Sequence, residues 1–585
     1  MATEYARRLA LREAEVAALD ASGRRLGNAR LAVAVATLLA GWWVLASAAI
    51  PLAWLLIGVA AFAGLVWSHH RVRRARAQAD RAAAFYRAGL ARIEDRWAGT
   101  GQAGDRFLDP HHVYAADLDL FGEGSLFELL CLARTRMGEE RLAQWLTSPA
   151  SPESIRSRQE SVTELGPLLD VREQFAIAGE QAGVGVQPSA LLRWSVAANR
   201  LQAGWVAMVS LLLPAAMLAM VVLWAITGIL WPLLGVLLVE SAILFALRSP
   251  IAAMLQGSES AFEDLRLFAD LLRRVEQAQF ISPALQALQA RMSAASRTIG
   301  RLATIVNFAG ARRNQAIALL IVPLMYTLLV ALAAERWRRL HGAEVATWVD
   351  VLADFEALLS LSAYHYEHPE DPFPELLTGA ASFEAQALGH PLIPSSRTVR
   401  NDVMIGGQTR ILLVSGSNMS GKSTLLRNVG INAVLAMAGA PVRARHLRLT
   451  PLQVGASIRV NDSLHEGSSR FYAEITRLRQ LFDLASQRAN LLFLLDELLQ
   501  GTNSRDRRIG AEGIVRALLA RGAIGLISTH DLALTEIDEA QGTLRNVHFQ
   551  DELRDGRITF DFTLREGVVT KSNAIELMRS VGLEV

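Results

Sequence analysis

The chain has 585 residues, of which 51% are hydrophobic and 20% are charged, with a mean hydropathy of +0.25. Such a composition is too apolar for a disordered or nucleic-acid-coating protein, and too charged for a transporter built only of membrane spans. At about 150 residues per domain, the length predicts several domains. The single cysteine, Cys131, excludes an intramolecular disulfide and a multi-cysteine zinc site. The net charge is +2, and the chain holds two lysines, Lys422 and Lys571, against 57 arginines, so either lysine is a candidate for a special role.

Two apolar stretches predict transmembrane hairpins. Residues 31–68 carry no charge and are interrupted once, by Pro51, which allows two short spans and a turn. They follow a mixed-charge segment, 1–30, which we expect to be a cytoplasmic helix and not a cleaved leader. Residues 203–247 carry Glu240 as their only charge, with Thr227-Gly228 near the middle, and predict a second pair of spans.

Arginines give the expected orientation. They flank the first hairpin on both sides and are absent from its turn, so both flanks are predicted to be cytoplasmic. We therefore expect a multi-pass protein of the inner or plasma membrane with both termini in the cytoplasm.

The intervening segments read as helical until about residue 379. Residues 259–309 have apolar positions at three- and four-residue spacing and predict one or two long amphipathic helices, interrupted near Pro283. From Gly379 onward, short apolar strands, glycine turns and helices alternate, which indicates an α/β domain. A domain boundary is therefore predicted near residue 380.

A phosphate-binding loop lies early in this α/β region. The apolar strand 411–414 runs into GxxxxGK[ST] and then a helix, the setting that this motif requires. Glycines let backbone N–H groups close around phosphate oxygens, and the helix N-terminus adds partial positive charge. Lys422 is expected to reach the β and γ phosphates of ATP, and the Ser423 hydroxyl to ligate Mg²⁺. The predicted nucleotide-binding residues are Gly416, Ser417, Asn418, Met419, Ser420, Gly421, Lys422, Ser423 and Thr424.

Two further strands end in residues suited to hydrolysis. The run 491–495 leads into Asp496, expected to hold Mg²⁺, and Glu497, expected to polarise the attacking water. The strand 523–528 ends at Thr529-His530, which places His530 where it would sense the γ-phosphate.

A predicted ATP site also bears on the apolar run 315–334. A fifth span there would put this site outside the cell, so a buried helix is favoured.

These motifs resemble the ATPase domain of the MutS mismatch-repair family, a branch of the ABC-type ATPases. GSNMSGKST is similar to the family's GPNMGGKST, and Ser417 and Ser420 depart from its proline and glycine. LLDELLQGTNSRDR and STHD resemble its Walker B region and histidine switch, and Thr570-Lys571-Ser572 resembles its SKS segment. The stretch 455–474 resembles its GA...DD...GxSTFxxEM run. By that match Ser469 is the signature serine that reaches the ATP of the opposing subunit in a homodimer, although Arg470 replaces the usual threonine.

The resemblance implies a fold class and an organisation. Residues 124–165 resemble the family's helical core, and 389–392 the element that introduces the ATPase, whereas no segment resembles the mismatch-recognition or connector domain. We expect an α/β P-loop ATPase domain of ABC type, C-terminal to an all-α core and lever domain with two transmembrane helical hairpins. The expected parts are an N-terminal helix (1–30), hairpin one (31–68), first part of the core (69–202), hairpin two (203–247), lever and core helices (248–379) and the ATPase domain (380–585).

Hairpin two interrupts the core where the family inserts its DNA clamp, so we hypothesise that a membrane hairpin replaces the clamp. The expected function is a membrane-anchored ATPase in which ATP binding and hydrolysis drive a dimeric conformational switch. DNA stays open as a partner, because no basic stripe is visible, and no small-molecule substrate other than ATP is inferred. The alternatives are an ABC-like transporter, disfavoured by the missing LSGGQ signature, and a nucleotide-sensing scaffold, disfavoured by Glu497.

Two histidine clusters are not expected to bind metal. His111 and His112 with Asp117 and Asp119 have spacing that fits no compact ligand set, which predicts a polar loop. The group 365–368 precedes Pro369 and is likewise expected to be a loop.

Overall fold

A computed structural model gives the architecture of most of the chain. It describes residues 1–47, 53–180, 188–197, 204–259, 262–310, 325–417, 419–459, 470–487, 490–499, 503–530, 542–554 and 557–569.

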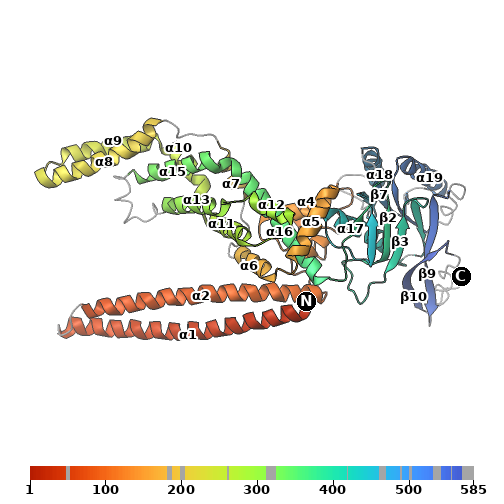
Figure 1. The fold of residues 1–585 in the computed structure, drawn as a ribbon, viewed down its shortest axis with the longest axis horizontal. Coiled ribbons are helices and arrows are strands. Elements are labelled where there is room, and N and C mark those ends of the chain that lie inside the picture. The colour runs from red at the N-terminus through yellow and green to blue at the C-terminus, as the bar shows by residue number, and fades with distance from the viewer. Residues whose placement is uncertain are drawn as a thin grey trace.

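Two long antiparallel helices form the first hairpin, α1 (Ala2–Ser47) and α2 (Ala53–Ile93) (Figure 1). Both run without interruption across the boundaries predicted at residues 30 and 68, so the apolar stretch 31–68 is only the outer part of a longer hairpin. The turn at 48–52 lies outside the described residues. At the apolar end the helices approach closely, because Gly58 lies directly against Thr37.

The second hairpin consists of α8 (Gly204–Thr227) and α9 (Trp231–Ala246), and it continues into α10 (Arg248–Glu259) through a bend of 59°. Both hairpins extend away from the α/β domain toward the same end of the molecule (Figure 1). Within the described residues, two helices are long and apolar enough to cross a membrane, or three if the bent pair α9–α10 counts as one span. The sequence had predicted four spans.

The helical domain lies between the hairpins and the α/β domain. Ser or Thr side chains cap the helices that begin at Arg136, Pro152 and Pro283, and proline occupies the first turn of the last two. Its elements are η1 (Asp105–Phe107), α3 (Leu126–Leu130), α4 (Arg136–Thr147), α5 (Pro152–Leu165), α6 (Leu169–Glu180), α7 (Pro188–Ser195), α11 (Phe262–Gln277), α12 (Pro283–Ala290), α13 (Ala295–Gly310), α15 (Tyr326–His341), η3 (Gly342–Glu344) and α16 (Val345–Glu367).

Three predictions for this domain are corrected or limited. The segment 259–309, predicted as one or two long helices, contains three, α11, α12 and α13, because the helical conformation is interrupted before both α12 and α13. The group 365–368 is not a loop, because His365 and Glu367 belong to the last turn of α16. Of the run 315–334, residues 315–324 lie outside the described part. The described remainder begins α15, where Leu328, Ala331 and Ala334 are buried, as the buried-helix interpretation expects.

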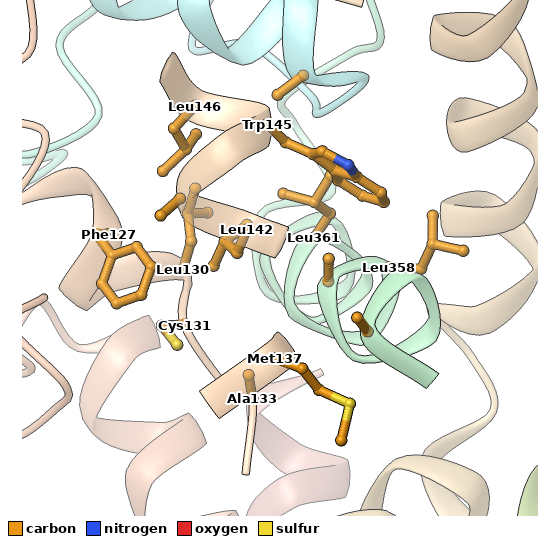
Figure 2. Close-up of a cluster of buried hydrophobic side chains, with 14 of the residues drawn as sticks. Phe127, Leu130, Cys131, Ala133, Met137, Leu142, Trp145, Leu146, Leu358 and Leu361 are labelled. Atoms are coloured by element: carbon orange, nitrogen blue, oxygen red, sulfur yellow. The ribbon is translucent and has the colours of Figure 1, made fainter. Parts of the chain in front are cut away.

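Helix α16 is the centre of the helical core. Leu361 on α16 lies beside Leu142 and Trp145 on α4, in a buried cluster that also contains Leu146 and Leu358 (Figure 2). The same buried cluster continues through α17 (Lys422–Ala438) into the α/β domain. The two domains therefore share one continuous core here, and a change in side-chain packing in one domain alters the packing in the other.

The α/β domain contains two sheets. The six-stranded sheet has the order β10-β9-β4-β8-β7-β6, with all neighbours parallel except the β10-β9 pair at one edge. Its strands are β4 (Ile411–Ser415), β6 (Gln453–Ser457), β7 (Leu491–Asp496), β8 (Ile524–Thr529), β9 (Leu544–Arg554) and β10 (Arg557–Glu566). The predicted strands β4, β7 and β8 are confirmed. A four-stranded sheet, not predicted, comprises β1 (Glu375–Leu376), β5 (His446–Leu449), β2 (Phe383–Leu388) and β3 (Asn401–Ile405) in that order.

Helices cover both faces of the larger sheet. In β4, Leu412 and Val414 belong to the core shared with α17, whereas Ile411 and Leu413 belong to the one shared with α18 (Arg470–Gln487) and α19 (Ser504–Ala520). Successive strand side chains point to opposite faces, so a strand buried on both sides reads as a continuous apolar run. This arrangement brings the C-terminal ends of β4, β7 and β8 together at one edge.

Candidate nucleotide-binding site

The loop between β4 and α17 has a backbone that glycine permits and other residues do not. Gly416 and Gly421 have φ angles of 149° and 106°. A Cβ on Gly416 would lie 2.8 Å from Ser420 Oγ and 3.1 Å from the Phe549 carbonyl oxygen. The loop is therefore wrapped tightly around the start of α17, in the strand–loop–helix order that the motif predicted.

Lys422 points back into this loop. Its Nζ donates hydrogen bonds of 2.9 Å to the carbonyl oxygens of both Gly416 and Ser417. Burial lowers the pKa of Lys422, while the charges of Glu497 and Asp496 act in the opposite direction. The ammonium thus lies inside the loop, facing the two carboxylates, with carbonyl partners that a bound phosphate can replace.

The other predicted loop residues are placed as follows. Ser417 and Ser420 carry buried hydroxyls that have no hydrogen-bond partner among the described residues, and Met419 is 85% exposed. Ser423 and Thr424 lie in the first turn of α17, whose free N–H groups and dipole favour an anion. Asn418 lies outside the described residues. Unpaired hydroxyls beside a helix N-terminus and an ammonium fit a phosphate chain.

Asp496, the last residue of β7, is paired in register with Ser528, the last residue but one of β8. The Ser528 hydroxyl donates a hydrogen bond to the Asp496 carboxylate. The same Ser528 Oγ accepts a hydrogen bond of 3.1 Å from the Glu497 N–H. One serine therefore fixes both the Asp496 carboxylate and the backbone that leads into Glu497.

Glu497 and His530 meet at this edge of the sheet. Glu497 adopts a left-handed φ of 51°, which turns the chain sharply after β7. His530 Nδ1 lies 3.4 Å from Glu497 Oε1, and the histidine side chain is 48% exposed. The structure thus brings together Lys422, Asp496, Glu497 and His530, four of the residues predicted to act at the site.

The donor set suits Mg²⁺, which prefers oxygen ligands and keeps several waters. The Asp496 carboxylate and the Ser423 hydroxyl lie on neighbouring elements, β7 and α17, and both supply oxygen. The described residues contain no group of three His, Cys, Asp or Glu side chains placed to hold a metal.

Two predicted site segments lie outside the described residues: 460–469, which carries Ser469, and 570–585, which carries Lys571. Just beyond the first of these, Glu474 of α18 is buried and its Oε1 accepts a 2.6 Å hydrogen bond from the Leu499 N–H. Leu499 follows Glu497 with a left-handed φ of 56°. Glu474 therefore holds the turn that carries Glu497, a role that its motif position alone did not reveal.

Comparison with known proteins identifies this domain. A family model described as MutS domain V matches residues 412–584. Residues of this chain are 31% identical over 259 positions to the DNA mismatch repair protein MutS 2 of Halobacterium salinarum, covering 43% of this chain and 28% of that one. Residues 412–584 thus form a domain of the MutS domain V family.

Two more relatives agree with this assignment. Identity is 34% over 202 residues to Endonuclease MutS2 of Thermus thermophilus, covering 34% of this chain and 26% of the relative. It is 31% over 243 residues to the DNA mismatch repair protein MutS of Streptococcus uberis, covering 41% and 28%. The matches thus span only about a quarter of the length of these curated relatives.

A cavity of about 200 Å³ opens beside the phosphate-binding loop of this MutS domain V. Gly421 and Thr424 line it on the loop side, with Arg397, Asn401 and Phe562 opposite. Asn401 fixes the strand that carries Phe562, since its Nδ2 donates to the Phe562 carbonyl at 3.0 Å and its Oδ1 accepts from the Leu564 N–H at 2.8 Å. Sequence reasoning missed these residues. Asn401 and Phe562 come from distant strands, and only the fold brings them to the loop.

The polar loop before α3 contacts the MutS domain V directly. Asp117 Oδ1 accepts backbone hydrogen bonds from Ile458 (2.8 Å) and Arg459 (2.6 Å). Arg477 of α18 donates to the carbonyl oxygens of Pro110, His111 and His112. The residues considered as a weak metal candidate thus form an interdomain contact.

Proposed function

We propose that this chain is a membrane-anchored ATPase of the MutS family, in which ATP binding and hydrolysis drive a conformational switch in a homodimer. The observation that carries the proposal is the meeting of Lys422, Asp496, Glu497 and His530 at one sheet edge beside the tight loop. A buried ammonium facing two carboxylates has little structural use without an anionic ligand and a cation between them.

In this proposal each residue has one role. The Lys422 ammonium exchanges its two carbonyl partners for phosphate oxygens, and the Ser417 and Ser420 hydroxyls gain an acceptor. Ser423 and Asp496 hold Mg²⁺, which when bound neutralises charge on the phosphates. Glu497 orients the attacking water, and His530, 3.4 Å from it, fixes the orientation of its carboxylate. Ser469 of one subunit completes the site of the other.

The exposed side chains of the two hairpins support the membrane anchor. Leu38, Trp42 and Leu56 on the first hairpin are 74%, 74% and 68% exposed, and Leu211 and Trp231 on the second are 70% and 80% exposed. Apolar surface of this extent requires a partner, and a hydrocarbon layer is the partner that suits helices of this length. The second hairpin carries no basic side chain within α8 and α9, unlike a DNA-holding clamp.

The names of the relatives suggest a partner on which the proposed ATP-driven switch acts. Two of those compared are named DNA mismatch repair proteins, so DNA is the partner to test first. We propose DNA contact through the soluble domains, with the ATP state transmitted along the helical core toward the bilayer. A multi-pass location in the plasma or inner membrane, with the ATPase domain in the cytoplasm, completes the proposal.

The test is ATP turnover by the full chain in nanodiscs. We expect steady phosphate release in the wild type, loss of nucleotide binding in Lys422→Ala, and retained binding with turnover reduced about 100-fold or more in Glu497→Gln. Arg479→Ala, on an exposed face of α18, is the matched control. Absence of ATP turnover in the wild type would contradict the proposal that the chain is an ATPase.

Two further measurements test the anchor and the partner. The chain should stay in membranes washed with alkaline carbonate, and its release would exclude spans. Duplex DNA at low salt, where phosphate contacts are strongest, should shift the protein in a gel and stimulate turnover. No shift would remove DNA from the proposal while leaving the ATPase intact.

A further inference from the structure

The arginines of the first hairpin divide into two groups along its length. In the half nearest the helical domain, four arginines have carboxylate partners on other helices: Arg8 with Asp170, Arg12 with Glu173, Arg87 with Glu13 and Arg92 with Glu367. The last such pair toward the tip joins Arg76 to Asp20 at 3.1 Å. Beyond this level no acidic residue occurs, because residues 21–79 contain neither Asp nor Glu.

Six arginines lie beyond that last pair and before the apolar tip. We call them the arginine collar: Arg24, Arg25, Arg30, Arg71, Arg73 and Arg74. All but Arg30 are exposed. Within the described residues the collar has no carboxylate partner, and the Arg71 guanidinium instead lies 4.2 Å from the centre of the Trp67 ring.

The two helices place these cations at the same height. Asp20 contacts Arg76, and Gly23 lies against Val72, so Arg24 and Arg25 of α1 are level with the arginines of α2. Immediately outward, the surface becomes apolar, with Leu31 67% exposed and Trp67 60% exposed. The change from unpaired cations to exposed apolar side chains therefore occurs on both helices at one level.

The length of the apolar part matches one bilayer. From Leu31 to Ser47, α1 has about 17 residues, or roughly 25 Å at about 1.5 Å per residue, against a hydrocarbon core of about 30 Å. With the tip near the far side, the collar lies at the near headgroup layer. A tryptophan at the boundary suits that layer as well.

We infer that the arginine collar is a binding site for anionic phospholipid headgroups, which hold the hairpin at a fixed depth. This inference rests on the proposed membrane anchor. Negative headgroups are the partner that the geometry supplies: the collar adjoins the apolar surface, and unpaired guanidiniums bind phosphate oxygens with two donors each. Duplex DNA would also bind these cations, but it offers no apolar surface to cover the adjoining exposed leucine and tryptophan side chains.

The test uses the full chain in a neutral detergent, with thermal unfolding followed as dihexanoylphosphatidylglycerol or dihexanoylphosphatidylcholine is added. The wild type should be stabilised by the anionic lipid and not by the neutral one, and less so at high salt. The variant Arg24→Gln, Arg25→Gln, Arg73→Gln, Arg74→Gln should weaken the apparent affinity for the anionic lipid about tenfold or more. The control carries the same charge change at four exposed arginines of the soluble domains, Arg156→Gln, Arg479→Gln, Arg505→Gln and Arg516→Gln, and should behave as wild type.

Further arms separate the sources of phosphate. Inorganic phosphate and a short DNA duplex are added in place of lipid. Stabilisation by either, lost in the collar variant and equal to that by the lipid, would overturn the lipid assignment. Equal stabilisation by both lipids, or an equal loss in the control variant, would also overturn it. Failure of the anchor itself looks different, because carbonate would then release wild type and variants alike. ATP turnover in detergent shows whether each variant is folded.

Discussion

The Asp119 carboxylate accepts a hydrogen bond from the Arg459 guanidinium at 2.5 Å, which ties the helical domain to the residue that precedes the segment carrying Ser469. The other Asp119 oxygen lies 3.4 Å from Arg427 on α17, the helix that begins with Lys422. One carboxylate therefore contacts both the phosphate-binding helix and Arg459, the residue next to the segment expected to serve the opposing subunit. Asp119 also has a left-handed φ of 52°, a conformation that needs support from its surroundings.

Asp119→Asn should weaken communication between the domains more than stability. The ion pairs are partly exposed, so their loss should cost at most about 1 kcal/mol in the free energy of unfolding. Turnover should fall several-fold, because the segment after Arg459 loses its tie to the helical domain, while single-site nucleotide affinity stays unchanged. Turnover and equilibrium binding of a fluorescent ATP analogue measure this. Asp483→Asn, which removes a pair confined to α18, is the control. Wild-type turnover in Asp119→Asn would contradict the expected role.

Ser528→Ala tests the strand-end geometry of the site. Ser528 donates to Asp496 and accepts from the Glu497 N–H, so alanine leaves both without this partner. We expect kcat to fall about tenfold with little change in KM, since the loop that binds phosphate is untouched. Ser486→Ala, whose hydroxyl donates to the Phe482 carbonyl within α18 and accepts from Arg521, is the matched control. A rise in KM at constant kcat would show that Ser528 serves binding and not the alignment of Asp496 and Glu497.

Local sequence patterns predicted which residues form the candidate ATP site, but not which side chains hold those residues in place. The strands before Gly416, after Leu491 and before His530 follow from continuous apolar runs, and a parallel sheet brings their ends together. Lys422, Asp496, Glu497 and His530 could therefore be placed in one site without a structure. Their second contacts, such as Ser528 and Glu474, could not, because they depend on register and on where α18 packs.

Long-range packing accounts for the larger departures. The local sequence could not distinguish the predicted helix that ends at residue 30 from the observed 46-residue helix α1. The two have the same sequence up to the start of the apolar part. The four-stranded sheet was missed because its strands are short and because β5 pairs with both β1 and β2 across 60 or more residues. The roles of Asp117 and Glu367 were missed for the same reason, because their partners lie in other domains.

Glu356 should make stability depend on pH. This carboxylate is buried in α16, and its pKa is raised to about 7 by burial, against hydrogen bonds from Thr135 and the Arg134 N–H that lower it. The folded state thus holds a proton that the unfolded state releases near pH 4.5. The resulting stabilisation is complete below about pH 4.5 and is lost as the pH rises through about 7, amounting to a few kcal/mol at most.

Glu356→Gln should remove this slope. The amide is neutral at every pH and keeps an oxygen for the Arg134 N–H, so thermal stability should vary less between pH 5 and pH 8 than in the wild type. Melting temperatures of the detergent-solubilised chain at several pH values give the comparison. Glu160→Gln, at an exposed position of α5, is the control. Parallel pH profiles for wild type and Glu356→Gln would show that another group sets the dependence.

The last prediction concerns the docking of the first hairpin on the helical domain. Arg92 of α2 donates to both carboxylate oxygens of Glu367, at 2.7 and 2.6 Å, and both side chains are buried. Tyr5 of α1 donates to Glu367 Oε1 at 3.2 Å and accepts from Arg172 at 2.9 Å. The end of α16 thus holds the base of both hairpin helices through one carboxylate.

Arg92→Met should destabilise the chain by about 3 to 5 kcal/mol, because it leaves the Glu367 charge buried without its bidentate partner. The double variant Arg92→Met, Glu367→Met should recover a large part of that loss, since it removes both charges and fills a similar volume. Melting temperatures, together with the rate of proteolysis in residues 94–104 after α2, measure the docking. A double variant no more stable than Arg92→Met would mean that the hydrogen bond from Tyr5, and not charge balance, secures the hairpin.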